Sequence, residues 1–231
     1  MAKYIVNIEN IFSNQPKGEL LQHKECIIGI SMSNPIYWRS SLNDVLKWAS
    51  QNFSTVHLVI GDFLNRFNEE ILKRQGIKAS EKSAVELGDK FMVRINKYLE
   101  EYPKPRFKII RWADLLKDKQ NKAQIKRIFK LYATNNAFKE MISTSASEYI
   151  EKQKKRGKTI YVSDEIAINL SACYLLEELA IFNNMISNGL RVIVYPGAQL
   201  SILTSMATGE FSEISDHLKD GIYVQLKVTK K

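Results

Sequence analysis

ECIIGIS (Glu25–Ser31) is the stretch of sequence that points most directly to the fold. Its β-branched, apolar residues predict a buried strand, and the glycine and serine near its end predict a tight turn. In an open α/β sheet, ligands bind beyond the carboxyl ends of the strands. Ser31 is therefore the first candidate for a nucleophile, and Gly29 leaves room for a substrate to lie against the backbone.

Strand-like runs alternate with helical patterns along the rest of the chain. This order predicts an α/β fold with a mostly parallel sheet and helices on both of its faces. No repeat, low-complexity segment or linker is visible, so we expect a single domain over residues 1–231. The last strand alternates with polar residues, which predicts an edge position. The expected strands are Cys26–Ile30, Thr55–Ile60, Arg106–Arg111, Arg191–Tyr195 and Ile222–Val228, and the expected helices are Ser41–Asn52, Phe63–Arg74, Ser80–Tyr102, Leu115–Ala133, Ala137–Lys155 and Ser163–Ser187.

The chain is basic, with 34 Lys and Arg against 25 Asp and Glu in 231 residues and a net charge of +9. A surplus of this size favours a polyanionic partner, either a nucleic acid or an anionic membrane. No run approaches the roughly 18 apolar residues of a membrane span, and the N-terminus lacks the features of a signal peptide. Cys26 and Cys173 lie in apolar segments, so we expect buried free thiols in a reducing compartment, the cytoplasm. The three histidines form no metal-ligand spacing with these cysteines.

The surroundings of Ser31 weigh against a hydrolase triad. A serine at the end of a strand is most often a turn residue that hydrogen-bonds the local backbone, but Asn34, three residues later, can orient a substrate or the turn. No histidine stands at a telling position for a Ser-His-Asp triad, and the second glycine of a nucleophile elbow is missing. If Ser31 attacks a substrate, we therefore expect that substrate to be already activated, as an ester is.

Tyr174 and Glu178 form the second candidate group. They are four residues apart, so on a helix they share one face, and the residues around them are so apolar that the helix is expected to be buried. A buried carboxylate is costly unless it meets a cation or hydrogen-bond donors. Glu178 could bind a substrate ammonium group or pair with a structural lysine or arginine, and the spacing alone does not decide between them. Tyr195, followed by Pro196, is expected at the same edge of the sheet as Ser31.

A helix with basic residues at regular spacing is the third candidate. The strip contains no acidic residue four positions away, so it could bind phosphates of a nucleic acid through backbone contacts, although a charged helix face is more often simply solvated. A second basic cluster, Lys152–Lys158, has no assigned role. No glycine-rich phosphate loop is present, so we expect neither a dinucleotide cofactor nor ATP hydrolysis. The strip consists of Lys119, Lys122, Lys126, Arg127 and Lys130.

Three stretches of the chain together resemble signatures of the cyclodipeptide synthases. HKECIIGIS, at His23–Ser31, is similar to the first signature of histidine, aliphatic residues and glycine-aliphatic-serine, with two extra residues after the histidine. YLLEELAI, at Tyr174–Ile181, is similar to the second signature and departs from it at Ala180, where the family usually has proline. Tyr195 and Pro196 resemble the tyrosine-proline pair that marks one of the two subfamilies.

The resemblance implies that the chain makes a cyclic dipeptide, a 2,5-diketopiperazine, from two aminoacyl-tRNAs in secondary metabolism. It also implies a Rossmann-like domain similar to the catalytic domain of class I aminoacyl-tRNA synthetases, without ATP or a metal. An aminoacyl-tRNA is an ester, so a serine can accept its acyl group in a nearly balanced exchange. By this resemblance Ser31 carries first the aminoacyl group and then the dipeptidyl group. Tyr174 and Glu178 hold the ammonium group of the first aminoacyl group, and Tyr195 positions the substrate or relays a proton.

The resemblance also assigns residues to the two parts of the substrate. The basic strip would grip the acceptor stem of the tRNA, and Asn34 would belong to the substrate-binding residues. The first side-chain pocket would be aliphatic, so we expect an apolar first amino acid with some promiscuity. We expect the protein to act as a monomer and without a cofactor. The pocket would be lined by Ile27, Gly29, Val59, Ile181 and Ile193.

Two other functions stay open at this point. The first is a non-catalytic α/β domain that binds tRNA or another RNA, in which Ser31 is only a turn residue. The second is a small-molecule esterase. That enzyme would need the fold to bring a histidine close to Ser31, and none of His23, His57 and His217 is well placed in the sequence.

Overall fold

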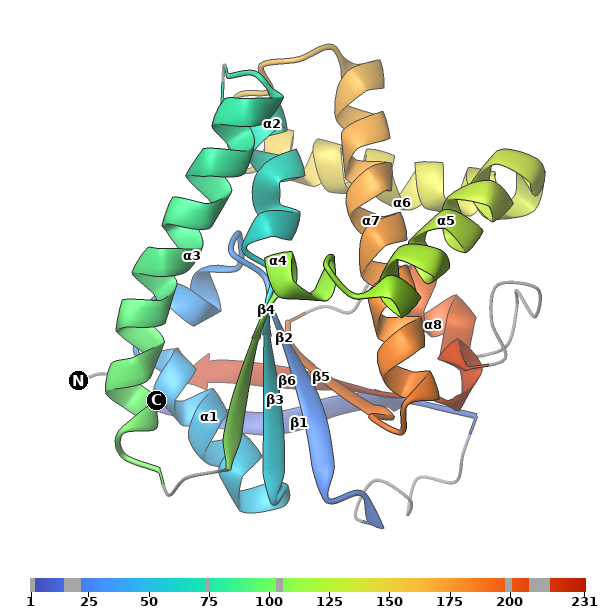
Figure 1. The fold of residues 1–231 in the computed structure, drawn as a ribbon. Coiled ribbons are helices and arrows are strands. Elements are labelled where there is room, and N and C mark those ends of the chain that lie inside the picture. The colour runs from blue at the N-terminus through green and yellow to red at the C-terminus, as the bar shows by residue number, and fades with distance from the viewer. Residues whose placement is uncertain (1–2, 15–21, 74, 103–105, 198–200, 208–216) are drawn as a thin grey trace.

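The computed structural model describes residues 3–14, 22–73, 75–102, 106–197, 201–207 and 217–231. Its strands form one sheet, with helices packed on both faces (Figure 1). The strands are β1 (Tyr4–Phe12), β2 (Glu25–Ile30), β3 (Thr55–Ile60), β4 (Phe107–Arg111), β5 (Val192–Pro196) and β6 (Ile222–Lys230). The helices are α1 (Ser41–Asn52), α2 (Arg66–Leu72), α3 (Ile77–Leu99), α4 (Trp112–Leu115), α5 (Lys119–Thr134), α6 (Asn136–Lys155), α7 (Asp164–Ser187) and α8 (Ser201–Ala207), with short 3₁₀ turns η2 (Pro35–Trp38), η3 (Phe63–Asn65) and η4 (Leu218–Asp220).

The sheet is mostly parallel, as the sequence predicts. Its strand order is β1-β6-β5-β2-β3-β4, and every neighbouring pair is parallel except β1 and β6. The predicted edge position of β6 is wrong, because β1 pairs along it from Tyr4 opposite Lys230 to Phe12 opposite Tyr223. β1 is missing from the sequence prediction because its side chains are largely exposed and polar residues interrupt its apolar alternation. This pairing brings the two ends of the chain together at one side of the molecule (Figure 1).

The sheet separates two apolar cores, because successive side chains of a strand point to opposite faces. On one face, Ile28 of β2 and Leu58 of β3 pack with α1 and with Phe91 of α3. On the other face, Ile27 and Val59 pack with α7 and with residues of α5 and α6. α7 is buried along most of its length, packed against α2, α5 and α6, with its carboxyl-terminal part beside the sheet (Figure 1). This burial explains why its sequence is apolar on nearly all sides.

The predicted helices are present, and side-chain caps explain some of the changes at their ends. The segment Leu115–Ala133 is divided between α4 and α5, because the Asp118 carboxylate accepts a hydrogen bond from the backbone N–H of Asn121 (2.9 Å) and caps α5. η3 and α2 together cover the second expected helix, and α3 begins at Ile77 rather than at Ser80. α8 is an additional short helix that its sequence did not predict.

The structure bears on two expectations from the sequence: the burial of the two cysteines and the absence of a membrane span. Both cysteines are free; Cys26 is buried as predicted, whereas Cys173 is only half-buried. Burial raises the pKa of both thiols, which keeps them protonated and unreactive near neutral pH. Among the described residues, no helix is both long enough and apolar enough to cross a membrane.

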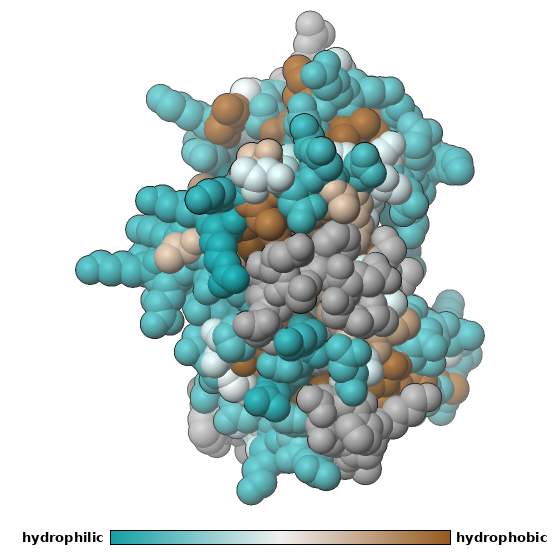
Figure 2. Space-filling model, turned by 90° about the vertical axis from the view of Figure 1, so that its right-hand side faces the viewer, coloured by the Kyte–Doolittle hydropathy of each residue, from teal (hydrophilic) through white to brown (hydrophobic). Residues whose placement is uncertain are grey.

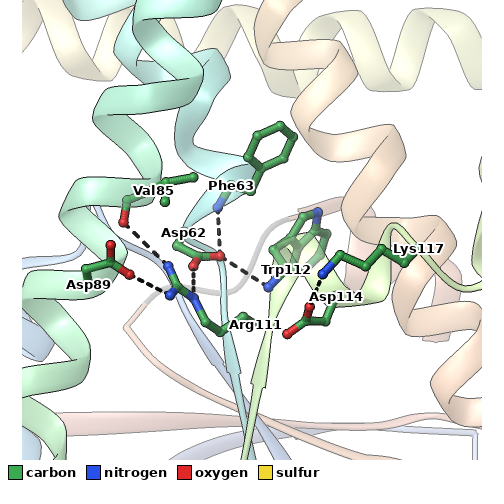
Figure 3. Close-up of polar contacts among 8 residues, drawn as sticks. All are labelled: Asp62, Phe63, Val85, Asp89, Arg111, Trp112, Asp114 and Lys117. Carbon is green, nitrogen blue, oxygen red and sulfur yellow. Dashed lines mark hydrogen bonds and ion pairs between the residues drawn. The ribbon is translucent and has the colours of Figure 1, made fainter.

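A buried polar network fixes the carboxyl ends of β3 and β4 (Figure 3). The Asp62 carboxylate, fully buried, accepts hydrogen bonds from the backbone N–H groups of Phe63 (2.7 Å) and Trp112 (3.2 Å). Its second oxygen pairs with the Arg111 guanidinium (2.5 Å), which also reaches Asp89 of α3 (2.5 Å). A buried charge with this many partners is satisfied, so the network joins both strands to α3 at the edge where the cavity described below opens.

Replacement of Gly88 by alanine tests how closely α3 must approach this network. A Cβ atom at Gly88 would lie 2.5 Å from Asp62 Cβ, which forces the helix and the network apart. We expect Gly88→Ala to lower the free energy of unfolding by about 1–3 kcal/mol, measured by urea denaturation. The matched control is Gly76→Ala at the start of α3, where a Cβ atom meets nothing within 4 Å. Equal stability of the two variants would contradict the role of close packing at Gly88.

Candidate active site

A cavity of about 370 Å³ lies beyond the carboxyl ends of β2 and β5, between these strands, α6 and α7. Its lining includes the four residues to which the sequence assigns chemistry: Ser31, Tyr174, Glu178 and Tyr195. The serine and Tyr195 come from two neighbouring parallel strands, whereas the other two come from one face of α7. The structure therefore brings together groups that are separated by more than 140 residues of sequence.

The loop after β2 holds Ser31 in a defined position. The backbone carbonyl of Ser31 accepts a hydrogen bond from the N–H of Asn34 (3.1 Å), and its hydroxyl lies 3.0 Å from the hydroxyl of Ser33. The Asn34 side chain caps η2 and donates to the Tyr195 hydroxyl (3.2 Å) and the Pro196 carbonyl (3.0 Å). Asn34 thus joins the serine loop to the end of β5, so it orients the turn, one of the two roles that its position suggested.

Two phenols face Ser31 across the cavity. Burial raises the pKa of Tyr174 and of Tyr195, while hydrogen bonding with Ser31 acts in the opposite direction on both groups. Both phenols are therefore protonated at neutral pH and can donate a hydrogen bond to oxygen atoms in the cavity. A third tyrosine, Tyr37 of η2, is fully buried beneath the site and donates to the carbonyl of Gly29 (2.7 Å).

Neighbouring acids on α7 have different environments. Glu177 accepts two hydrogen bonds from the Arg66 guanidinium (3.1 and 2.6 Å) and one from the Trp112 indole (2.7 Å), so it is the structural ion pair of this helix. Glu178 faces the cavity, and within the described part of the chain no cation reaches it. Burial raises the pKa of Glu178 from 4.5 to about 7. The pairing with a structural arginine that the sequence allowed for Glu178 is therefore made by Glu177, one residue earlier.

The apolar part of the cavity differs from the predicted side-chain pocket. Gly29 and Ile193 line it, as expected. Ile27, Val59 and Ile181 are instead fully buried in the core on the same side of the sheet, and they are not among the lining residues. A Cβ atom on Gly29 would lie 3.4 Å from the ring of Phe182, which also lines the cavity. The apolar wall is completed by Leu175, Phe182 and Leu203.

The two basic groups lie in different places. The five residues of the α5 strip are all exposed, and no residue of α5 lines the cavity as described. Their side of the molecule is largely hydrophilic (Figure 2). Lys152 and Arg156, from the cluster without an assigned role, do line the cavity. The lysine lies in the last turn of α6 and the arginine caps that helix.

α6 contributes a polar wall that the sequence analysis missed. Tyr149 lines the cavity and donates a hydrogen bond to the Asn68 side chain of α2 (3.0 Å). Ser145 and Gln153 lie on the same side of the helix, one turn before and one turn after Tyr149. This four-residue spacing of polar groups was the available signal. It did not show which neighbour that face of α6 would meet.

Histidine is absent from the described lining of the cavity. His57 lies on β3, where its Nε2 atom is 2.7 Å from a carboxylate oxygen of Glu25 at the start of β2. The amino ends of the strands are opposite the edge that carries Ser31. The described structure thus provides no imidazole base for the esterase alternative.

Solved structures share this fold over nearly the whole chain. A cyclodipeptide synthase from Fluoribacter dumoffii has a TM-score of 0.81 and 21% identity, covering 99% of this chain and 100% of that one. A Mycobacterium tuberculosis protein, whose structure relates cyclodipeptide synthetases to type I tRNA synthetases, has a TM-score of 0.75 and 14% identity over 99% and 94% of the two chains. A cyclodipeptide synthase from Candidatus Glomeribacter gigasporarum bound to Phe-tRNAPhe has a TM-score of 0.60 and 19% identity over 91% and 90%. This chain has the Rossmann-like α/β fold that these solved structures share.

The family follows from the sequence itself. A family model described as cyclodipeptide synthase matches residues 17–187. The chain belongs to the cyclodipeptide synthase family, which makes it an enzyme dependent on aminoacyl-tRNA and confirms the family named by resemblance. The matched region ends before Tyr195 and Pro196, so it does not assign the subfamily. No curated protein matches this chain.

Glutamine substitutions at the two neighbouring acids test their different environments. Because the pKa of Glu178 is raised to about 7 when folded, the folded state loses stability relative to the unfolded state as pH rises from about 4.5 to 7. We expect Glu178→Gln to have nearly wild-type stability near pH 4 and to be more stable by up to about 3 kcal/mol near pH 8. Glu177→Gln leaves Arg66 without its charge partner and is expected to cost about 3 kcal/mol.

Urea denaturation of wild type and of both variants across this pH range measures the difference. Each glutamine keeps the size of the side chain, so each variant serves as the control for the other. Destabilisation by Glu178→Gln near pH 8 would show that Glu178 has a structural partner and would remove it from the candidate site.

Proposed function

We propose that this protein joins two aminoacyl groups from aminoacyl-tRNAs into a cyclic dipeptide by ping-pong acyl transfer through Ser31. The observation that carries the proposal is the placement of Ser31 and Glu178 in one cavity, with the pKa of the acid raised to about 7. A serine without an imidazole base suits a substrate that arrives activated as an ester. We therefore propose that neither ATP nor a metal takes part.

The first half-reaction loads the enzyme. The Ser31 hydroxyl oxygen attacks the ester carbonyl of the first aminoacyl-tRNA, and the terminal ribose oxygen leaves and takes up a proton. One ester is broken and one is formed, so the exchange is nearly balanced. Tyr195, held by Asn34 (3.2 Å), positions the reacting groups and relays the proton between the two oxygens.

The second half-reaction needs a neutral amine. Glu178 and Tyr174 bind the ammonium group of the aminoacyl-enzyme, which supplies the missing counter-charge for the carboxylate. Glu178, with a pKa of about 7, then accepts a proton from this group. The neutral amine attacks the ester of the second aminoacyl-tRNA, and the tRNA hydroxyl leaves. The amine of the second aminoacyl group, after losing its extra proton to solvent, attacks the ester carbonyl on Ser31. The amide bond closes the ring, and the serine oxygen leaves and takes up the proton released by the attacking nitrogen.

Further features support narrower parts of the proposal. The wall formed by Leu175, Phe182 and Ile193 suits an apolar first amino acid. Tyr195 and Pro196 stand together at the end of β5, and Tyr195 lines the cavity, which supports the proposed placement in the tyrosine-proline subfamily. We propose that the protein acts as a monomer. A non-catalytic RNA-binding domain is the competing function, and the next experiment separates the two.

Replacement of the nucleophile tests the chemistry directly. With aminoacyl-tRNA radiolabelled in the amino acid, we expect the wild type to become covalently labelled and to release a cyclic dipeptide identified by mass spectrometry. Ser31→Ala should lose both signals. The matched control is Ser33→Ala, which removes the neighbouring hydroxyl 3.0 Å away and should keep the covalent label. Labelling of Ser31→Ala, or no labelling of wild type, would contradict the mechanism.

Charge removal on α5 tests whether the strip grips the acceptor stem. We expect Lys122→Ala/Lys126→Ala/Arg127→Ala to raise KM for aminoacyl-tRNA and to flatten its salt dependence by about one unit of log–log slope for each phosphate that the strip no longer binds. The control removes an equal charge from the far end of β6, with Lys227→Ala/Lys230→Ala/Lys231→Ala. If both triple variants change KM equally, the strip contributes only net charge and is not a binding surface.

A further inference from the structure

The basic cluster at the end of α6 differs from an ordinary solvated helix end. Of its cations, Lys154 is neutralised by Glu151 (2.9 Å) and Asp164 (2.8 Å). Lys152 and Arg156 line the cavity that holds Ser31. No acidic side chain within the described ranges pairs with either of them. The cavity therefore has a positively charged rim, formed by Lys152 and Arg156, that no acid of the described ranges neutralises.

The charge of this rim reaches the reacting groups. Arg156 lowers the pKa of both Tyr149 and Tyr195, against the larger effect of burial. Both tyrosines line the cavity, so Arg156 acts on it from α6 while Tyr195 stands at the end of β5. The carbonyl groups at the carboxyl end of α6 favour cations at this position.

The chemistry of the substrate gives this rim a ligand. In an aminoacyl-tRNA the ester and the nearest phosphate are attached to the same terminal ribose. When the ester carbonyl lies at Ser31, that phosphate must therefore lie close to the cavity, near its mouth. Arginine and lysine are the side chains best suited to bind a phosphodiester. No residue of the α5 strip lines the cavity, whereas Lys152 and Arg156 do, so these two are the cations placed to meet this phosphate.

We propose that Lys152 and Arg156 bind the phosphodiesters of the terminal CCA of aminoacyl-tRNA and thereby place its ester at Ser31. This inference rests on the proposed function and names a second contact with the tRNA, separate from the α5 strip. The contact is made to the backbone of a single-stranded end, so it is independent of base identity. Its role is to position the ester in front of the serine, and no proton passes through either side chain.

The first test compares two double variants, each of which loses two positive charges near the same end of α6. We expect Lys152→Ala/Arg156→Ala to lower kcat/KM for covalent labelling of Ser31 by an aminoacylated minihelix about tenfold, as for two charge contacts of modest strength. The log–log salt slope should fall by about 1.4, since each phosphate on a single strand contributes about 0.7. The control, Lys155→Ala/Lys158→Ala, removes two exposed cations that do not line the cavity and should stay within about twofold of wild type.

The second test changes the substrate instead of the protein. Neutral methylphosphonates at the two CCA phosphodiesters of the minihelix should lower kcat/KM for the wild type to the level of Lys152→Ala/Arg156→Ala. The same substrate should cause little further reduction in that variant, because its phosphate-binding side chains are already absent. Independent, multiplicative reductions would overturn the inference, and so would equal reductions in the two double variants. Failure of the proposed function would be seen separately, as the absence of any label on wild-type Ser31.

Discussion

The buried ion pair between Glu177 and Arg66 is the interaction on which the site depends. A carboxylate inside an apolar helix is tolerated only with full compensation, and Glu177 receives it from the guanidinium and from the indole of Trp112. Adjacent helix residues point about 100° apart, so fixing Glu177 toward α2 and α4 also fixes the direction of Glu178. That direction is the cavity, which Glu178 shares with Tyr174 one turn earlier.

This ion pair is one end of a continuous network that reaches the sheet. Trp112 donates its indole N–H to Glu177. Its backbone N–H donates to Asp62, and Asp62 binds Arg111 at the end of β4 (Figure 3). The ends of β3 and β4 are thus joined to α7 without passing through the cavity. Groups that must hold a reacting ester benefit from such a frame, because their geometry is set before the substrate binds.

Much of this architecture could be predicted from the chain because it follows local rules. Apolar, β-branched runs indicated the buried strands, and the four-residue spacing of Tyr174 and Glu178 indicated one face of α7. The rest depends on which elements meet. Lys152 and Arg156 had no assigned role until α6 was seen to line the cavity, and Ile27, Val59 and Ile181, which the resemblance assigned to the pocket, lie in the core instead. β1 was missed for a related reason, since an exposed edge strand needs little apolar alternation.

The different environments of Glu177 and Glu178 explain why this cavity suits an amine that carries an ester. An uncompensated carboxylate weakens the folded state above its ordinary pKa, and Glu178 is such a group beside the fully paired Glu177. With a pKa of about 7, Glu178 can hold an ammonium group as a carboxylate and also accept its proton. If a structural cation paired with Glu178 as Arg66 pairs with Glu177, it would stabilise the charged carboxylate. Glu178 would then lose both abilities. The same reasoning applies to the rim, where Lys152 and Arg156 are left unpaired by acids of the described chain and so stay available to an anionic substrate. Among the described residues, partners of opposite charge are thus missing for Glu178 and for the two cations, and an aminoacyl ester of RNA would supply both, an ammonium group for the acid and phosphates for the cations.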